Sequence, residues 1–236
     1  MFYGGETILP LVNINNMSTQ QAIFFDDFTS SYIPHILKEI FIDQVYAPYM
    51  KYIKDGIVLD VGGNVGLFTY FAILNGAKHC YIVEPSKGHI ETIKKMTKFN
   101  GIEDKVTVLP YALSHENGEM ELFHSKNVTA HSLLHGMDNA GTSEKVRTVT
   151  LDVLMKENKI EKIDFCKLDC EGSEFGILAS QDFKETAKKI DAMVTEFHAW
   201  PQVNYSQGVA ALRDAGYTLK KMATEAYVLG CIREDL

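Results

Sequence analysis

Three stretches of this sequence carry polar residues with the types and spacing that ligand chemistry requires. Residues 58–66 read VLDVGGNVG, so an apolar segment runs into Asp60 and then into three glycines within five positions. Glu84 stands 24 residues further on, at the end of the next apolar segment. Residues 167–175 read KLDCEGSEF, which places three carboxylates within six positions. If the apolar segments are parallel strands, these stretches meet at the carboxyl edge of one sheet, where open α/β proteins bind their ligands.

The glycine-rich stretch favours a nucleoside ligand without phosphates. The dinucleotide pattern G-x-G-x-x-G fails because Val61 stands where its first glycine belongs, and no G-K-[ST] follows as a P-loop needs. Asn64 occupies the position where a pyrophosphate requires bare backbone, whereas S-adenosylmethionine ends in an amino acid. A tight turn with a structural aspartate is the alternative interpretation. The cofactor-binding residues expected in this stretch are Asp60, Gly62, Gly63, Asn64 and Gly66.

The carboxylate of Glu84 is expected to accept hydrogen bonds from both hydroxyls of a ribose. Pro85 then ends the strand and, with Ser86, begins the next helix. NAD and S-adenosylmethionine both use an acid here, so a nicotinamide-dependent oxidoreductase remains an alternative, which the missing first glycine disfavours. The adenine is expected beside the segment after the third strand, which adds Tyr111 and Ala112 to the predicted cofactor site.

If the ligand is S-adenosylmethionine and the methyl acceptor is a hydroxyl, the transfer requires a base or a metal ion, because the hydroxyl must lose its proton as it attacks. Asp169 and His198, at the ends of the fourth and fifth predicted strands, are the candidate catalytic bases, and Asp169 is also expected beside the cofactor. Strand alternation places Glu196 on the same face as His198. No spacing rule requires a metal, but Mg²⁺ has a possible oxygen-rich set in Asp169, Glu171, Glu196 and His198. Acceptor contacts are expected from Glu171, Glu174, Glu196, His131 and Ser132.

Alternating strands and helices must position these residues. Strands are expected at 57–61, 79–84, 105–110, 163–169 and 192–198, and helices at 64–75, 86–100, about 174–180 and 207–215. Uniformly apolar strands separated by helices predict a parallel sheet covered by helices on both faces. The final segments, 216–222 and 226–232, suit a closing antiparallel pair.

The amino-terminal region differs from this alternation. Residues 1–55 form the expected N-terminal helical cap, which is irregular over 1–17 and then helical. Pro34 and Pro48 break the helical part into short helices.

Residues 56–236 form the expected main domain, into which a ribbon and loop are inserted at about 115–150. Within the insertion, 125–144 is too long for a plain connection, so we expect a mobile lid over the acceptor. Its histidines, together with His124, are surface residues of that lid in the simplest interpretation, and a metal cluster is the alternative.

The composition is that of an ordinary globular protein. The 236 residues are 46% hydrophobic and 23% charged, and the net charge of −8 disfavours a surface that binds the phosphates of a nucleic acid. The four cysteines lack zinc-ligand spacing, which indicates a reduced, cytoplasmic protein. The uncharged stretch at 7–25 contains Pro10 and several amides, so neither a membrane span nor a secretory signal is expected.

Five motifs in order resemble the FkbM-type family of class I, S-adenosylmethionine-dependent methyltransferases: VLDVGGNVG, IVEPS, VTLD, DFCKLDCEGSE and EFH. The resemblance covers roughly residues 39–200 and begins with EIFIDQVY. It implies a Rossmann-like fold with a mostly parallel seven-stranded sheet, S-adenosylmethionine as donor, and O-methylation of a sugar or another small hydroxyl acceptor. Gly63 stands where the family usually has Ala, and Cys170 where Val is commoner. A methyltransferase acting on nucleic acid or protein, or a binding module that has lost catalysis, remains an alternative.

Overall fold

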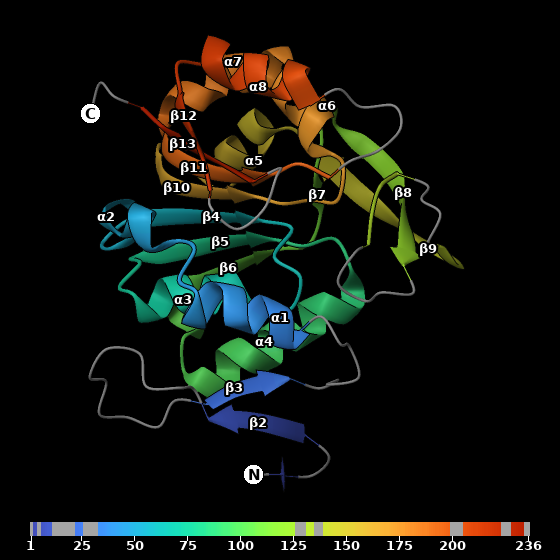
Figure 1. Cartoon of the computed structure of the whole chain (residues 1–236). Coiled ribbons are helices and arrows are strands. Elements are labelled where there is room, and N and C mark those ends of the chain that lie inside the picture. Colours follow the sequence, from blue (N-terminus) through green and yellow to red (C-terminus); the bar gives the residue numbers. More distant parts are fainter. Residues whose placement is uncertain are drawn as a thin grey trace.

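The computed structural model describes residues 2–3, 6–10, 22–25, 33–125, 131–134, 139–198, 205–222 and 228–233. Within these ranges seven strands form one sheet in the order β12-β13-β11-β10-β4-β5-β6 (Figure 1). Their bounds are β4 Ile57–Val61, β5 His79–Val83, β6 Val106–Leu109, β10 Ile163–Leu168, β11 Ile190–Glu196, β12 Thr218–Lys221 and β13 Val228–Ile232. The pairs from β11 to β6 are parallel, and β13 is antiparallel to both of its neighbours. The predicted Rossmann-like fold with a mostly parallel seven-stranded sheet is confirmed.

Strand alternation supplies two apolar cores, one on each face of the sheet. In β4, Leu59 and Val61 belong to one core and Val58 to the other. Because both faces are covered, the strands read as continuous apolar runs in the sequence. Asp60 and Lys167, which are paired in the register of β4 and β10, are buried polar residues in this apolar setting.

Helices cover both faces of the sheet (Figure 1). The helices α3 (Leu67–Leu74) and α4 (Lys87–Asn100) lie on one face, and α5 (Leu151–Glu157), α6 (Glu174–Ala179), α7 (Gln181–Thr186) and α8 (Tyr205–Asp214) lie on the other. The four predicted helices correspond to α3, α4, α6 and α8, whereas the short α5 and α7 were not predicted. No helix among the described residues has the length and apolarity needed to cross a membrane.

The part of the N-terminal cap described at 33–53 is helical, as predicted. It consists of α1 (Ile33–Leu37), the π-helix η1 (Lys38–Ile42), the 3₁₀ helix η2 (Ala47–Tyr49) and α2 (Met50–Ile53). The ring centroid of Tyr46 lies 4.6 Å from that of Phe68 and 6.3 Å from that of Phe165. The cap therefore shares one apolar core with α3 and β10.

Nearer the amino terminus, three short strands pair antiparallel: β1 (Phe2–Tyr3), β2 (Glu6–Pro10) and β3 (Ala22–Phe25). The prediction of irregular structure over 1–17 and helix from residue 18 is wrong for these residues. The sequence of β3, AIFF, is apolar and partly aromatic, and such short runs favour strands when a partner strand is available. The other residues before Ile33 lie outside the described ranges.

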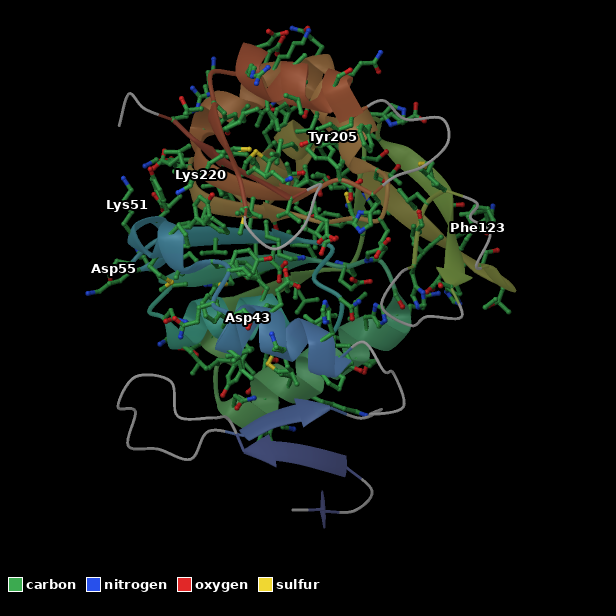
Figure 2. The ribbon with its side chains drawn as sticks, in the orientation of Figure 1. Asp43, Lys51, Asp55, Phe123, Tyr205 and Lys220 are labelled. Atoms are coloured by element: carbon green, nitrogen blue, oxygen red, sulfur yellow. The ribbon has the colours of Figure 1, made fainter. Side chains whose placement is uncertain are left out.

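The predicted insertion is a ribbon in which β8 (Gly118–Ser125) pairs antiparallel with β9 (Asn139–Val149). A two-residue strand, β7 (Ala112–Leu113), pairs parallel with β9. Because β9 begins at residue 139, the connection is shorter than the predicted loop at 125–144; residues 126–130 and 135–138 lie outside the described ranges. In Figure 2 the ribbon, marked by Phe123, lies across the molecule from Asp55, which precedes β4. The ribbon is therefore on the side of the sheet's carboxyl edge.

Candidate active site

A cavity of about 350 Å³ opens at the carboxyl ends of β4, β5, β10 and β11. Its volume is in the range typical of small-molecule sites. The cap contributes Glu39 and Tyr46 to its wall, and the ribbon contributes Leu122. The predicted site residues that line it are Gly62, Gly63, Asn64, Glu84, Pro85, Ala112, His131, Asp169, Glu171, Glu196 and His198. The predicted residues outside this lining are Asp60, Gly66, Ser86, Tyr111, Ser132 and Glu174.

The glycine-rich turn uses its own backbone amides. Gly62 N and Gly63 N donate to the carbonyl oxygen of Val83 at 3.0 and 3.1 Å. Asn64 N donates to Glu84 Oε2 at 2.8 Å. The turn therefore does not present this row of amides to a phosphate, in agreement with the missing dinucleotide pattern.

Packing within the protein explains these glycines in a way that the sequence did not suggest. Gly62 has a φ of +73°, and a Cβ there would collide with the backbone carbonyl oxygen of Asp169. At Gly63 a Cβ would collide with the side chain of Ile82. Gly66, with a φ of +86°, begins α3. The close approach of the β10 backbone is therefore enough to require glycine at position 62, whether or not a ligand approaches it, whereas at position 63 the side chain of Ile82 would have to move.

Glu84 is 4% exposed, and the protein fixes its carboxylate in the cavity wall. Oε2 accepts from Asn64 N, and Oε1 accepts from Ser86 N at 2.8 Å and lies 3.3 Å from His89 Nδ1. Ser86 therefore orients Glu84 from behind the wall. A carboxylate oxygen has two lone-pair sites, so Oε2 retains acceptor capacity for a ribose hydroxyl.

Asp60 lies beneath the cavity, with no exposed surface. Its Oδ2 accepts from Thr69 Oγ1 of α3 at 2.7 Å, and its Oδ1 has no hydrogen-bond partner among the described residues. Burial raises the pKa of Asp60, and Lys167 and Thr69 counteract part of that rise. A ligand in the cavity therefore meets Asp60 only through an intermediary.

Lys167 is the cavity residue that the sequence analysis missed. It is 9% exposed, and its Nζ donates to Asp169 Oδ2 at 2.7 Å and lies 3.9 Å from Asp60 Oδ1. Burial alone lowers the pKa of Lys167, but the two carboxylates hold it well above its usual value, so the ammonium is charged. The available signal was a lysine inside the apolar strand IDFCKL, because a buried lysine requires a partner.

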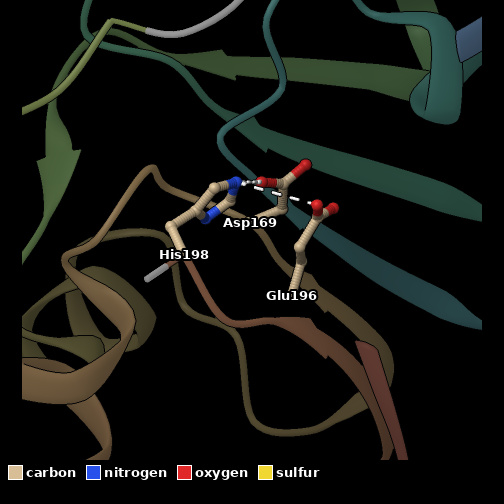
Figure 3. A group of neighbouring side chains, drawn as sticks. All are labelled: Asp169, Glu196 and His198. Carbon is tan, nitrogen blue, oxygen red and sulfur yellow. Dashed lines mark ion pairs between the residues drawn. The ribbon is translucent and has the colours of Figure 1, made fainter. Parts of the chain in front are cut away.

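His198 lies close to four carboxylates, two of which, Asp169 and Glu196, are drawn with it in Figure 3. Its Nδ1 lies 3.1 Å from Glu174 Oε1, and its Nε2 lies 3.4 Å from Glu171 and 3.7 Å from both Asp169 and Glu196. Burial lowers the pKa of His198, but the hydrogen bond to Glu174 and the other acids outweigh it and raise that pKa to about 10. The imidazole is therefore protonated at neutral pH in this arrangement.

The carboxylates of this group differ in how far nearby positive charges offset the unfavourable effect of burial on their ionised forms. Burial raises the pKa of Asp169, but Lys167 and His198 outweigh it and hold that pKa below its usual value. Burial raises the pKa of Glu171 to about 7 and that of Glu196 to about 8, because His198 compensates them only in part. Glu171 and Glu196 are thus the carboxylates in this group that take up protons near neutral pH.

Glu174 and Ser132 support the site without lining it. Glu174 has no exposed surface and accepts hydrogen bonds from Cys170 N and Gly172 N, both at 2.8 Å, so it fixes the turn after β10. Ser132 Oγ donates to the carbonyl oxygen of Glu171 at 2.5 Å. Both predicted acceptor contacts therefore act on the turn that carries Glu171.

The predicted adenine contact Tyr111 lies in the apolar core. Its hydroxyl accepts from Asn158 Nδ2 at 3.0 Å, and the guanidinium of Arg147 lies 5.3 Å from its ring centroid. Its neighbour Ala112 lines the cavity instead. Among the described residues, the side chain of Tyr111 thus packs in the core behind the cavity and does not line it.

His131 connects the ribbon to the cavity wall. Its ring stacks on His89 with centroids 4.8 Å apart and on His124 with centroids 4.9 Å apart. Burial, with these two neighbours, lowers the pKa of His131 to about 4, so its ring is neutral. Among the described residues, a metal-binding geometry occurs instead at Asp169, Glu196 and His198, whose ligand atoms lie within 4.8 Å of one another.

Comparisons with known proteins find methyltransferases. The family model "Methyltransferase FkbM domain" matches residues 60–219. The hexuronic acid methyltransferase AglP of Haloferax volcanii is 26% identical over 148 residues, which are 62% of this chain and 57% of AglP. Protein arginine N-methyltransferase 1.1 of Arabidopsis thaliana is 33% identical over 114 residues, which are 46% of this chain and 29% of the relative. The chain thus spans less than two thirds of the length of both relatives.

Among solved structures, the crystal structure of methyltransferase FkbM from Methylobacillus flagellatus KT superposes with a TM-score of 0.50 at 14% identity, over 75% of this chain and 43% of that one. At this identity the similarity concerns the fold alone. The family model, in contrast, covers most of the chain, including the glycine-rich turn and the carboxylate group. The chain belongs to the FkbM family of S-adenosylmethionine-dependent methyltransferases.

Proposed function

We propose that this chain transfers the methyl group of S-adenosylmethionine to a hydroxyl of a small, saccharide-like acceptor. The observation that carries the proposal is a single cavity whose wall contains Glu84 at one end and Asp169, Glu196 and His198 at the other. This arrangement serves a ribose-bearing donor and a hydroxyl acceptor together. The relative AglP, whose name specifies a hexuronic acid, supports a saccharide as the acceptor class.

The donor fits the residues at the β4 and β5 ends of the cavity. Glu84 is rigidly held with acceptor capacity for a ribose, and the turn offers few free amides to a competing phosphate. When bound, S-adenosylmethionine supplies an electrophilic methyl group for in-line displacement, a reaction that depends on orientation. The residues proposed to surround it are Asp60, Gly62, Gly63, Asn64, Gly66, Glu84, Pro85, Ser86, Ala112 and Asp169, with Tyr111 behind them.

The acceptor hydroxyl is proposed to lie against Asp169 and His198. Asp169, compensated by Lys167, is suited to accept a hydrogen bond from that hydroxyl and orient it. The proton then passes to the group around His198, where Glu171 and Glu196 have pKa values of about 7 and 8, the range that a general base needs. Of the two predicted bases, Asp169 thus orients the hydroxyl, and the protonated His198 stabilises the negative charge of Glu171 and Glu196.

We also propose that this chemistry needs no Mg²⁺. The ammonium of Lys167 and the protonated imidazole of His198 already supply two positive charges to the carboxylates that a metal ion would otherwise bind. A nucleic-acid acceptor is disfavoured, because the chain has a net charge of −8 and several carboxylates line the cavity.

The proposal is tested with purified protein in two steps. S-Adenosylhomocysteine is titrated by calorimetry, and binding is expected. The protein is then incubated with methyl-labelled S-adenosylmethionine and a panel of neutral sugars, uronic acids and peptides, and labelled products are separated by mass. Absence of binding at millimolar S-adenosylhomocysteine contradicts the donor assignment, and label in peptides alone contradicts the acceptor class.

A further inference from the structure

The tips of β4 and β10 leave few hydrogen-bond donors for a buried carboxylate in the cavity. Asp169 N donates to the carbonyl oxygen of Val61, and Cys170 N and Gly172 N donate to Glu174. The amides of the glycine-rich turn are likewise used within the protein, as described above. A ligand carboxylate brought to this place needs a donor from a side chain, because an unpaired buried charge is strongly unfavourable.

Lys167 is the one lysine or arginine among the described residues that line the cavity. An ammonium has three N–H groups. One of them goes to Asp169 Oδ2 at 2.7 Å, and Asp60 Oδ1, at 3.9 Å, is beyond hydrogen-bond distance. His198 is a half-buried cation in the same wall, but its two nitrogens already face four carboxylates. Lys167 therefore has the donor capacity that the backbone lacks.

The pair of Lys167 and Asp169 presents one positive and one negative group side by side in the cavity wall. The amino-acid end of S-adenosylmethionine also carries one positive and one negative group. We propose that Lys167 binds the carboxylate of the donor's amino-acid end, while Asp169 faces its ammonium. This inference rests on the proposed function, and it gives the direct contacts with the donor's amino-acid end to Lys167 and Asp169 rather than to the buried Asp60.

Three adenosyl ligands separate this role from a structural one. S-Adenosylhomocysteine carries both charged groups, its decarboxylated analogue S-adenosyl-3-thiopropylamine carries only the ammonium, and 5′-methylthioadenosine carries neither. Calorimetry on the wild-type protein is expected to show that loss of the carboxylate weakens binding about tenfold to a hundredfold, as for a charge-assisted hydrogen bond. Because this comparison uses the unaltered protein, it does not depend on the folding of a variant.

Lys167→Met is expected to bring the affinity for S-adenosylhomocysteine down to that for the decarboxylated analogue. The affinity of Lys167→Met for 5′-methylthioadenosine should stay within about twofold of the wild-type value. Lys167→Arg should restore part of the lost affinity for S-adenosylhomocysteine. The matched control is Lys162→Met, which removes a positive charge from an ion pair with Asp191 outside the cavity. It should leave all three affinities unchanged.

Each outcome has one meaning. If the wild-type protein binds no adenosyl ligand, the proposed function itself fails. If it binds S-adenosylhomocysteine and the decarboxylated analogue equally, the donor assignment stands and the role of Lys167 is wrong. If Lys167→Met weakens all three ligands alike, Lys167 only maintains the cavity, and the inference is also wrong.

Discussion

At the scale of single residues, Glu84 is held in place by the protein before any ligand binds. Its carboxylate accepts from Asn64 N and Ser86 N, so it orders the turn as well as facing the cavity. We predict that Glu84→Gln weakens S-adenosylhomocysteine and 5′-methylthioadenosine alike, by about tenfold or more, because both contain the ribose. Calorimetry measures both affinities. The exposed Glu91→Gln on α4 is the control, and unchanged affinity in Glu84→Gln contradicts the ribose assignment.

The acidic group around His198 gives a prediction for metal ions. Because Lys167 and His198 already compensate these carboxylates, we expect Mg²⁺ to bind the ligand-free protein no more tightly than about 1 mM and EDTA to leave methyl transfer unchanged. Calorimetry and the labelling assay measure the two quantities. Saturable binding at micromolar Mg²⁺ that disappears in Glu196→Gln shows instead that the group is a metal site.

The same group predicts how stability depends on pH. The pKa of His198 is raised from 6.5 to about 10, so its contribution is complete below pH 6.5 and is lost as the pH rises toward 10. The pKa of Glu196 is raised from 4.5 to about 8, so the folded state keeps a proton that the unfolded chain releases, and stability again falls as the pH rises. Both groups therefore make the stability of the ligand-free protein fall as the pH rises, Glu196 from pH 4.5 to about 8 and His198 from pH 6.5 to about 10.

Thermal unfolding of the ligand-free protein at pH 6 and pH 9 checks this sign. We expect Tm to fall more between pH 6 and pH 9 in the wild type than in Glu196→Gln. The glutamine does not titrate, and it leaves His198 with one carboxylate fewer beside it. The exposed Glu103→Gln should behave like the wild type. Equal pH dependence in the wild type and Glu196→Gln contradicts the assigned electrostatics.

At the scale of elements, the glycine-rich turn is constrained by its contact with β10. Gly62→Ala places a methyl group against the carbonyl of Asp169 and also forces a positive φ on alanine. Gly101 has a positive φ as well, but a Cβ there meets nothing within 4 Å. We predict that Gly62→Ala lowers the free energy of unfolding by about 1–3 kcal/mol more than Gly101→Ala, measured by urea denaturation. If the two substitutions lower the free energy of unfolding equally, the positive φ explains the effect and the contact with Asp169 contributes nothing.

The strands of the sheet other than β12 could be predicted because each is a short, largely apolar run, and the run predicted at 57–61 coincides with β4. The seven-residue α5 and the six-residue α7 are too short for helical periodicity to stand out. Tyr111 was assigned to the adenine by its place after a strand, and place in the chain does not determine the direction of a side chain. Lys167 was overlooked although its hydrogen-bonded partner Asp169 follows two residues later; its second ionic partner, Asp60, comes from a different strand.

At the scale of the whole molecule, the cap and the sheet are joined by one aromatic core. Tyr46 lies between Phe68 of α3 and Phe165 of β10, and it also lines the cavity. The boundary at residue 55 is therefore proposed to separate parts of one cooperative unit. We predict that Tyr46→Ala lowers the free energy of unfolding by about 3–5 kcal/mol.

Urea unfolding followed by far-ultraviolet circular dichroism and by near-ultraviolet absorbance measures this effect. The two signals should change in one coincident transition in both proteins. Ile42→Ala, at an exposed position of the cap, should leave the transition nearly unchanged. Two separate transitions mean that the cap folds independently.

The crowding of four carboxylates around His198 also bears on product release. Methyl transfer changes the sulfur of the donor from a cation to a neutral thioether. The carboxylates of this wall attract the first form more strongly than the second, so the reaction itself weakens the attraction between the protein and the adenosyl product. We expect this loss of charge to favour exchange of the spent molecule for a fresh one after each turnover.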